Sequence, residues 1–590
     1  MNVTRLFDLS DRYRELYPDK PDALAGKVNG EWVKHSTRSF LENVELVSYG
    51  LLAMGLQKGE KIATLSNNRP EWNFVDLGMM QAGAIHVPIY PTISAADLKF
   101  ILTDAEVKYV FVSSQELWEK VEPVVKELPG IQGMFTFDQI PGKPHWTAIT
   151  EKGKQHPAKA EVDAIKSTIG PNDLATLLYT SGTTGFPKGV MLSHDNILSQ
   201  IIAARILAPV DVNCRALSFL PLNHVYERVL SYLYMYLGVS IYYAESIEKV
   251  ADNLKEVQPE IFGCVPRLFE KVYDKIIAKG SDLSGIKKKL FFWAVDLGLK
   301  YEINGANGAW YEFQLKIARK LIFSKWQEAL GGKVRVAISG GAALQPRLAR
   351  IFWAAQIPIL EGYGLTETSP VICVNTLEPG GLKFTTVGKA LDRVTVRIAE
   401  DGEILCKGPN VMLGYYKRPD LTAEMIDSEG WLHTGDIGEL VDGQYLRITD
   451  RKKEIFKTSG GKYIVPQTIE NKIKESRFVE QVMVIGENRK YAAALIVPNF
   501  AFLKEWCERK QIPVPATNEE LICIERVKNR VMKDVNLVNE TLGSYETIKK
   551  IQLLPREWSI DRGEMTPKLS LKRKVIMEAN KMLVEKLYEE

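Results

Sequence analysis

The chain has 590 residues, with 76 Lys+Arg against 73 Asp+Glu, a net charge of +3, 45% hydrophobic residues and 25% charged residues. This composition excludes collagen-like, disordered and disulfide-scaffold classes. Single hydrophobic cores stop growing at about 250–300 residues, so the length predicts at least two domains. The near-neutral charge argues against a nucleic-acid partner, because phosphate contacts usually need a clear basic excess.

Cysteine spacing indicates a reducing compartment, and hydropathy gives no sign of a signal peptide or a membrane span. Six cysteines are scattered and none lies in a C-x-x-C pair, which favours a cytosolic protein over a secreted framework or a zinc site. Residues Met1–Lys20 lack the continuous apolar core of a signal peptide. The most apolar stretch, Val229–Ala244, is shorter than the roughly 20 residues of a spanning helix. We expect a buried helix that turns into a strand there, in a soluble, cytoplasmic protein.

Short apolar or β-branched runs alternate with amphipathic segments through the first 440 residues, which predicts α/β layers with parallel strands. Helical spacing occurs at Pro70–Gln81 and Ala95–Asp104. Strands are expected at 61–66, 84–89, 107–114, 174–181, 239–244 and 334–339.

Near residue 450 the pattern changes to a hairpin, a basic segment and a glycine turn. Strands are then expected at Val479–Gly486 and Ala492–Pro498, with helices over Asn518–Leu542 and Arg573–Tyr588. We therefore predict a large N-terminal domain of layered α/β subdomains, residues 1–449, and a smaller α+β domain, residues 450–590.

A glycine- and hydroxyl-rich segment follows the strand expected at 174–181. Small residues let the backbone approach a ligand, hydroxyls and amides donate hydrogen bonds, and Lys188 adds positive charge, which suits a polyphosphate. The spacing fits neither G-x-x-x-x-G-K nor G-x-G-x-x-G, and the alternative is an ordinary surface turn. The residues are Thr180, Ser181, Gly182, Thr183, Thr184, Gly185 and Lys188.

The run YTSGTTGFPKGVMLSH resembles the phosphate loop of the adenylate-forming superfamily, which includes acyl-CoA synthetases. The run EGYGLTE at 361–367 is similar to a second motif of that family. The resemblance implies that Tyr363 and Gly364 lie against the purine, that Thr366 contacts a phosphate during catalysis, and that Glu367 binds Mg²⁺. Residues Gly340, Gly341 and Ala342 resemble the adenine-binding loop.

Three further matches follow in the family's order. Asp436 in GWLHTGD corresponds to the carboxylate that binds the ribose, and Asp450-Arg451 resembles the hinge and its nucleotide-binding arginine. The segment MTPKLSLKR resembles the one that carries the catalytic lysine. Alignment places that amine at Lys572, and a shift in register would place it at Lys568.

The resemblance implies a two-step reaction with ATP, Mg²⁺ and coenzyme A. A carboxylate first forms an acyl adenylate, and the thiol of coenzyme A then displaces AMP. Between the steps the small domain, which is mobile in this family, rotates about Asp450. The loop of Ser459, Gly460, Gly461 and Lys462 would then line the coenzyme A channel.

Residues outside the phosphate motifs indicate the acid. LPLNHVYER at 220–228 resembles long-chain fatty acyl synthetases, in which this segment lies beside the acyl group, and His224 would lie near the carboxylate. Amphipathic stripes at 286–297 and 310–321 lie beside several lysines. They fit either core packing or peripheral contact with a membrane.

Two alternatives stay open. An adenylating enzyme could use another carboxylate or load a carrier protein in trans, although no Asp-Ser-Leu attachment motif is evident. A non-catalytic nucleotide-binding scaffold would be a second alternative, and the full set of motif residues argues against it. The sequence says nothing about oligomeric state or preferred acyl chain length.

Overall fold

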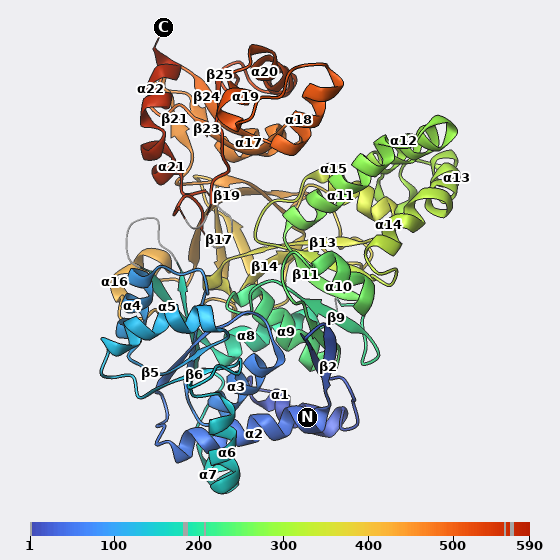
Figure 1. Cartoon of the computed structure of the whole chain (residues 1–590). Helices are drawn as coiled ribbons and strands as arrows, with labels where there is room; N and C mark the ends of the chain where they lie inside the picture. Colours follow the sequence, from blue (N-terminus) through green and yellow to red (C-terminus); the bar gives the residue numbers. More distant parts are fainter. Residues whose placement is uncertain (1–2, 181–186, 206–207, 560–561, 567–570, 590) are drawn as a thin grey trace. The chain divides into compact units, whose positions relative to one another are not determined.

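The computed structural model describes residues 3–180, 187–205, 208–559, 562–566 and 571–589 (Figure 1). The chain forms two compact units. Unit 1 comprises residues 1–396, 406–432 and 441–446, and unit 2 comprises residues 397–405, 433–440 and 447–590. The predicted boundary at residue 450 stays a prediction, and each unit is described by itself.

The first sheet of unit 1 has seven strands. They are β3 (Lys61–Leu65), β4 (Ile85–Ile89), β5 (Val107–Val112), β6 (Gly133–Thr136), β7 (Leu174–Thr180), β8 (Lys188–Ser193) and β18 (Gly414–Tyr415). Their spatial order is β18-β8-β7-β4-β3-β5-β6. The strands from β7 to β6 are parallel, and β8 and β18 add antiparallel pairs at one edge. All six strands predicted in the first 440 residues are confirmed, with ends within two residues of the observed bounds of β3, β4, β5, β7, β10 and β12.

The second sheet of unit 1 has nine strands in the order β15-β14-β13-β12-β11-β9-β10-β1-β2. Its centre, from β10 to β13, is parallel. The strands are β1 (Leu24–Val28), β2 (Glu31–His35), β9 (Arg215–Ser218), β10 (Ser240–Tyr243), β11 (Ile261–Cys264), β12 (Val336–Ser339), β13 (Ile359–Gly364), β14 (Val371–Val374) and β15 (Lys389–Ala390).

Helices cover both sheets, as expected for parallel strands joined by crossovers. The predicted helices at Pro70–Gln81 and Ala95–Asp104 are confirmed with the same bounds, because Pro70 occupies the first turn of one and the Ser94 hydroxyl caps the other. The helices are α1 (Asp8–Leu16), α2 (Thr37–Ala53), α3 (Pro70–Gln81), α4 (Ala95–Asp104), α5 (Gln115–Lys126), α6 (Thr147–Gln155), α7 (Lys159–Ser167), α8 (His194–Ala204), α9 (Val225–Leu237), α10 (Val250–Val257), α11 (Pro266–Ser281), α12 (Gly285–Leu299), α13 (Ala309–Ala318), α14 (Ser324–Ala329), α15 (Pro346–Ala354) and α16 (Pro419–Met425), with short turns η1 (Ile303–Gly305), η2 (Arg319–Phe323) and η3 (Thr366–Thr368).

The predicted change from helix to strand within 229–244 is confirmed, since α9 ends at Leu237 and β10 begins at Ser240. No helix in the described ranges is long and apolar enough to cross a membrane.

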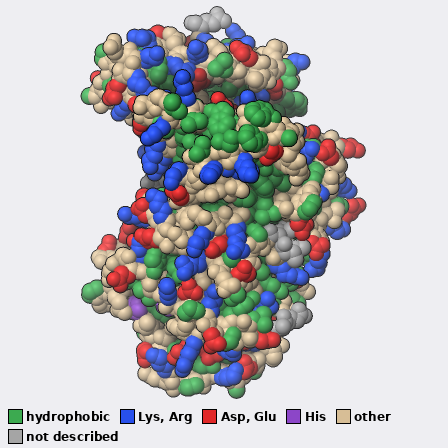
Figure 2. All heavy atoms as spheres, turned by 90° about the vertical axis from the view of Figure 1, so that its right-hand side faces the viewer, with side chains coloured by type: hydrophobic (Ala, Val, Ile, Leu, Met, Phe, Trp, Pro, Cys, Tyr) green, Lys and Arg blue, Asp and Glu red, His purple; other side chains and the backbone are tan. Residues whose placement is uncertain are grey.

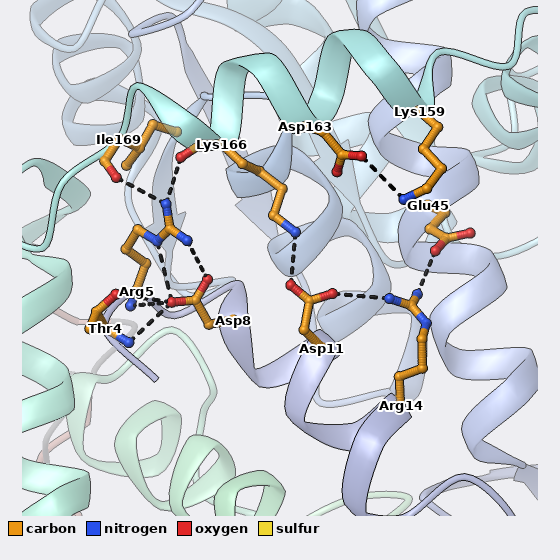
Figure 3. A network of polar contacts seen from close by, with 10 residues as sticks. All are labelled: Thr4, Arg5, Asp8, Asp11, Arg14, Glu45, Lys159, Asp163, Lys166 and Ile169. Carbon is orange, nitrogen blue, oxygen red and sulfur yellow. Dashed lines mark hydrogen bonds and ion pairs between the residues drawn. The ribbon is translucent and has the colours of Figure 1, made fainter. Parts of the chain in front are cut away.

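A polar network ties the N-terminal helix α1 to α7 and α2 (Figure 3). Arg5 Nη1 donates to the carbonyl oxygens of Lys166, at 2.6 Å, and Ile169, at 3.2 Å. The Lys166 ammonium lies 2.9 Å from Asp11, and Arg14 lies 2.5 Å from Glu45. The first helix is therefore part of the fold of unit 1.

A second network, fully buried, joins helix α9 to the first sheet. Arg228 Nη2 lies 2.6 Å from Asp76 Oδ1 on α3, and Arg228 Nη1 donates to Thr176 Oγ1 of β7 at 2.7 Å. Tyr232 donates to the same carboxylate at 2.5 Å, and His86 Nδ1 of β4 lies 2.6 Å from it. Burial alone would raise the pKa of Asp76, but Arg228 and His86 outweigh it and lower the pKa.

Unit 2 is built on a three-stranded sheet in the order β23-β24-β25, and strands β16, β17, β19 and β20 form a separate four-stranded sheet. Hydrophobic clusters cover both faces of the three-stranded sheet, which confirms the predicted α+β character. The strands are β16 (Thr395–Ile398), β17 (Glu403–Lys407), β19 (Leu432–Val441), β20 (Tyr445–Arg451), β21 (Phe456–Lys457), β22 (Tyr463–Ile464), β23 (Val479–Ile485), β24 (Ala492–Pro498) and β25 (Ile548–Leu553). The helices are α17 (Pro466–Ile473), α18 (Phe500–Arg509), α19 (Asn518–Ile522), α20 (Glu525–Asn539), α21 (Arg573–Ala579) and α22 (Lys581–Tyr588).

All six cysteines are free thiols, and Cys523, between α19 and α20, is the exposed one. The other five are buried, and burial raises the pKa of each, to about 11 for Cys406. Reduced, buried thiols are what the scattered cysteine pattern predicted.

The buried His86 predicts how stability depends on pH. Burial, followed by the charge of Arg228, lowers the pKa of His86 to about 4, whereas an unfolded histidine titrates near 6.5. The unfolded chain therefore binds more protons between these values, and the stabilisation, complete above pH 6.5, is lost as pH falls toward 4. We expect His86→Asn to flatten the plot of Tm against pH in this window, with a change of up to about 1.4 kcal/mol per pH unit.

The exposed His156 provides a matched control, since His156→Asn should leave the slope as it is in the wild type. Thermal unfolding followed by circular dichroism from pH 4 to 7 measures all three proteins. Identical slopes for wild type and His86→Asn would contradict the assignment.

Candidate active site

Strands β7 and β8 bracket the glycine-rich segment. They pair antiparallel, with Thr180 opposite Lys188, so both ends of the segment lie side by side at the edge of the first sheet. Ser181, Gly182, Thr183, Thr184 and Gly185 lie outside the described residues. Their predicted role at the phosphates therefore stays a prediction.

Tyr415 connects Lys188 to Glu367. The Lys188 ammonium lies 5.1 Å from the centre of the Tyr415 ring, and the Tyr415 hydroxyl donates to Glu367 Oε1 at 2.9 Å. Two predicted site residues from segments far apart in the chain thus meet at one aromatic side chain. No pattern in the sequence pointed to Tyr415, because a tyrosine in a run such as LGYYKRP is usually a core residue.

The turn from β13 into η3 carries Tyr363, Gly364, Thr366 and Glu367. A Cβ at Gly364 would lie 1.6 Å from the carbonyl oxygen of Pro370, so no larger residue fits there. The Leu365 amide donates to Thr368 Oγ1 at 2.8 Å and holds the turn. Thr366 is 4% exposed, and Tyr363 is half-buried. This close packing fixes the backbone from which the Glu367 side chain extends.

Gly340, Gly341 and Ala342 follow β12, and Tyr226 of α9 lies beside them. The Tyr226 hydroxyl donates to the carbonyl oxygen of Ile338 at 2.8 Å, and a Cβ at Gly340 would lie 3.4 Å from its ring. The structure therefore brings the predicted adenine loop next to the helix that begins at the predicted acyl segment.

His224 is the N-cap of α9. Its Nδ1 accepts a hydrogen bond from the Tyr226 amide at 3.0 Å, which assigns the proton of the neutral ring to Nε2. Its ring centre lies 6.5 Å from that of Tyr90, and burial raises the pKa of Tyr90. The predicted proximity of His224 to a carboxylate is not tested by these contacts.

Two carboxylic acids near these segments have raised pKa values. Burial raises the pKa of Glu227 on α9 and of Glu361 in β13, each to about 8. Glu227 is fully buried, and its Oε2 would lie 3.3 Å from a Cβ at Gly263. Both residues stand inside motifs quoted from the sequence, but neither was assigned a role, because sequence spacing does not reveal desolvation.

Unit 2 holds a second group of predicted residues. Arg451 Nε lies 3.3 Å from Asp436 Oδ1, so the predicted ribose carboxylate and its neighbouring arginine are together on adjacent strands β19 and β20. Asp450 is buried and accepts from the Arg451 amide at 2.5 Å. Burial raises the pKa of Asp450 to about 6, which places its titration close to neutral pH.

The predicted coenzyme A loop is the turn between β21 and β22. The Thr458 amide donates to the carbonyl oxygen of Lys462 at 3.0 Å, and Gly461 has a positive φ of 76°. Ser459 donates through its amide to the carbonyl oxygen of Arg489. The exposed tip at Ser459, Gly460, Gly461 and Lys462 is thus a short hairpin turn, as predicted for a glycine turn in this position.

Lys572 precedes α21, and its amide donates to the carbonyl oxygen of Glu564 at 2.8 Å. The next residue, Arg573, lies 2.7 Å from the buried Glu470 and fixes the start of the helix. Lys568 lies outside the described residues, so the choice between Lys572 and Lys568 stays open.

The residues around Glu367 suit Mg²⁺. A carboxylate next to the hydroxyl of Thr366 offers hard oxygen donors, and Mg²⁺ typically takes one or two carboxylates plus substrate phosphates and water. No cluster of three or more His, Cys, Asp or Glu residues that could enclose a metal occurs in the described part of the chain. A metal held jointly with a nucleotide is what this donor set supports.

The layered α/β sheets of unit 1 and the smaller α+β unit 2 form a fold that is also found in solved adenylate-forming enzymes. Solved structures with this fold include the adenylation domain of a carboxylate reductase from Mycobacterium chelonae, at TM-score 0.76 and 21% identity, covering 99% of this chain and 91% of that one. The A domain of carboxylic acid reductase from Segniliparus rugosus, in complex with AMP and a carboxylic acid, gives TM-score 0.74 and 21% identity over 99% and 94%. At these identities the similarity shows the fold alone.

Sequence comparison gives the family. Residues 12–416 match the AMP-binding enzyme model, and residues 453–590 match the AMP-binding enzyme C-terminal domain. The chain belongs to the AMP-binding enzyme family. It is 32% identical to Mycobacterium bovis long-chain-fatty-acid–CoA ligase FadD15, covering 97% of this chain and 95% of the relative, and 32% identical to human long-chain-fatty-acid–CoA ligase 1, covering 95% and 82%.

Proposed function

We propose that the chain activates a long-chain fatty acid with ATP and transfers the acyl group to coenzyme A, releasing AMP and pyrophosphate. The observation that carries the proposal is that Lys188 and Glu367 both contact Tyr415, in a family member whose relatives described above are long-chain-fatty-acid–CoA ligases. Lys188 supplies positive charge and Glu367 an oxygen ligand, both of which a bound polyphosphate needs.

In the first step the fatty-acid carboxylate attacks the α-phosphorus of ATP. A new acyl–phosphate bond forms, and the bond to pyrophosphate breaks. Lys188, Thr366 and Lys572 neutralise and orient the phosphate oxygens, and positioning with charge neutralisation is the main requirement of such a transfer. Mg²⁺, when bound at Glu367, would neutralise further charge on the departing pyrophosphate.

The residues proposed to recognise the nucleotide are those that the family motifs identify. Tyr363 and Gly364 contact the purine face, and the loop Gly340, Gly341 and Ala342 reads the base edge with its backbone. Asp436 accepts hydrogen bonds from the ribose hydroxyls, and Arg451, which already contacts Asp436, reaches the ribose or the α-phosphate. Thr180, Ser181, Gly182, Thr183, Thr184 and Gly185 complete the phosphate loop.

In the second step the thiol of coenzyme A attacks the acyl carbonyl carbon. The carbon–sulfur bond forms, AMP leaves, and the thiol proton is released. We propose residues 1–449 as the AMP- and acyl-binding domain, with His224 near the carboxylate, and residues 450–590 as a mobile domain that carries the lysine. Rotation about Asp450 exchanges Lys572 for the loop Ser459, Gly460, Gly461 and Lys462, which lines the coenzyme A channel.

We also propose a cytoplasmic protein that contacts membranes through one surface, the α12–α13 patch. Its six apolar side chains are all more than a third exposed, and Trp310 and Phe313, which reach 70% and 55%, stack with ring centres 5.6 Å apart. The patch consists of Ile286, Leu290, Trp310, Phe313, Ile317 and Leu321.

The basic charge around the α12–α13 patch favours an anionic membrane as its partner. Helices α12 and α13 with η2 carry six basic residues against two acidic ones. Figure 2 faces the side where these helices lie in Figure 1, and it shows hydrophobic side chains gathered beside Lys and Arg. A second copy docked symmetrically would oppose lysine to lysine, whereas an anionic bilayer accepts both the rings and the charges.

The first prediction tests the reaction itself. With palmitate and ATP, the protein should release pyrophosphate before coenzyme A is added, and AMP only afterwards. A chain-length series from acetate to very long acids identifies the preferred acid. Release of AMP only with a carrier protein would favour the carrier-loading alternative, and nucleotide binding without pyrophosphate release would favour the scaffold.

The second prediction tests the hinge. Proline fixes φ and removes the amide donor, so Asp450→Pro should restrict rotation. We expect pyrophosphate release to stay near the wild-type rate while thioester formation slows by more than about tenfold, which corresponds to about 1.4 kcal/mol in the barrier. Asp450→Asn, which keeps the backbone free, is the control. Equal losses in both half-reactions would contradict hinge rotation.

The third prediction tests the α12–α13 patch. The double variant Trp310→Glu/Phe313→Glu should bind vesicles of anionic phospholipid at least about tenfold more weakly, because burial of each ring is worth roughly 1.5–3 kcal/mol. Leu537→Glu, at a 53% exposed position in unit 2, is the matched control. Sedimentation with vesicles measures binding. Unchanged sedimentation of a folded double variant would refute the membrane contact.

A further inference from the structure

Tyr415 is held rigidly at the edge of the first sheet. Strand β18 pairs antiparallel with β8, with Tyr415 opposite Val190. The Tyr415 amide donates to Thr422 Oγ1 at 2.8 Å, and the next amide, of Tyr416, donates to the carbonyl oxygen of Gly189 at 2.8 Å. The Tyr415 side chain is 5% exposed. Its backbone and ring are therefore fixed before any ligand binds.

The hydroxyl of Tyr415 orients the Glu367 carboxylate. Among the described residues, this carboxylate accepts one hydrogen bond, from the Tyr415 hydroxyl to Oε1 at 2.9 Å. A second tie acts on the backbone, since the Met412 amide, three residues before Tyr415, donates to the carbonyl oxygen of Glu367 at 2.9 Å. One short segment, residues 412–415, thus holds both the main chain and the side chain of Glu367, the metal-binding candidate.

The second contact of Tyr415 is between its aromatic ring and the Lys188 ammonium. The ammonium lies 5.1 Å from the ring centre, within the range of a cation–π interaction, and no ion pair among the described residues involves Lys188. An aromatic face attracts the ammonium without neutralising it. The lysine therefore stays available to a phosphate, and the tyrosine holds it on the same side chain that contacts Glu367.

We propose that Tyr415 is a positioning residue that orients both the Glu367 carboxylate and the Lys188 ammonium toward the polyphosphate of Mg·ATP. The inference rests on the proposed function, because it assumes that these two groups bind Mg²⁺ and phosphate. Its two contacts are chemically separable. The hydroxyl orients Glu367, which would bind the metal, and the ring orients Lys188.

Calorimetric titration of the full chain with ATP, in excess Mg²⁺ and separately in EDTA, tests the proposal without turnover. Tyr415→Phe removes the hydroxyl and keeps the ring. We expect the gain in ATP affinity caused by Mg²⁺ to fall about tenfold, as for loss of a hydrogen bond to a charged group, while affinity in EDTA stays unchanged. Tyr415→Leu removes the ring as well and should weaken ATP binding in EDTA by about threefold.

Tyr416→Phe is the matched control, because the neighbouring tyrosine contacts Lys61 and Lys417 instead of the site residues. It should titrate like the wild type under both conditions. A purely structural role for Tyr415 predicts a different pattern, in which Tyr415→Phe lowers Tm and weakens ATP binding equally with and without Mg²⁺. That pattern, or a Tyr415→Phe protein indistinguishable from the wild type, overturns the inference.

The wild-type protein separates this inference from the proposed function. If ATP affinity of the wild type rises with Mg²⁺ and Tyr415→Phe keeps the full gain, the inference alone is overturned. If the wild type binds ATP without any response to Mg²⁺, the proposed function is overturned, and the inference with it.

Discussion

The contact between Arg228 and Asp76 is the interaction on which the arrangement of unit 1 depends. Both side chains are fully buried, and their charges compensate each other within a network that includes His86, Tyr232 and Thr176. Removing one partner of such a pair costs about 3–5 kcal/mol, because the other charge stays buried without compensation. The network attaches α9 to α3 and to two strands of the first sheet. The helix in turn carries His224 at its start and Tyr226 beside the loop after β12, so the position of these residues follows from one ion pair.

The candidate site combines residues from the ends of three elements that lie far apart in the sequence. Lys188 begins a strand, Glu367 lies in a short turn and Tyr415 ends a two-residue strand. Chemistry-bearing side chains on such ends can be fixed by neighbouring strands while remaining accessible to a ligand. The raised pKa values of Glu227 and Glu361, both caused by burial, indicate that water has little access to this part of unit 1. Charge on a bound nucleotide would therefore be felt more strongly there than in water.

The sequence predicted the features that depend on local pattern. Helices at Pro70–Gln81 and Ala95–Asp104 have clear starts in Pro70 and Ser94, and buried parallel strands are short apolar runs whatever their partners. The motifs identified the family. Contacts over long separations were out of reach, which is why Tyr415 was missed although Lys188 and Glu367 were not.

Two other features could not be predicted for related reasons. Periodicity showed an apolar stripe at 310–321 but could not tell whether another element covers it, and the exposure of Trp310 answers that question. A change in sequence pattern near residue 450 gave the predicted domain boundary, which stays a prediction. The pattern could not reveal that residues 397–405 and 433–440 belong to unit 2, because strands join a sheet by pairing and not by sequence order.

The cysteine pattern has a practical consequence for observing movement. Since Cys523 is the one exposed thiol of the six and lies in unit 2, a thiol-reactive dye should attach there in the wild-type chain, while the five buried thiols, with raised pKa values, react slowly. A fluorophore on Cys523 and a second one introduced on unit 1 would report the distance between the two labels. Energy transfer between them would then follow the small unit, molecule by molecule, as nucleotide and coenzyme A are added.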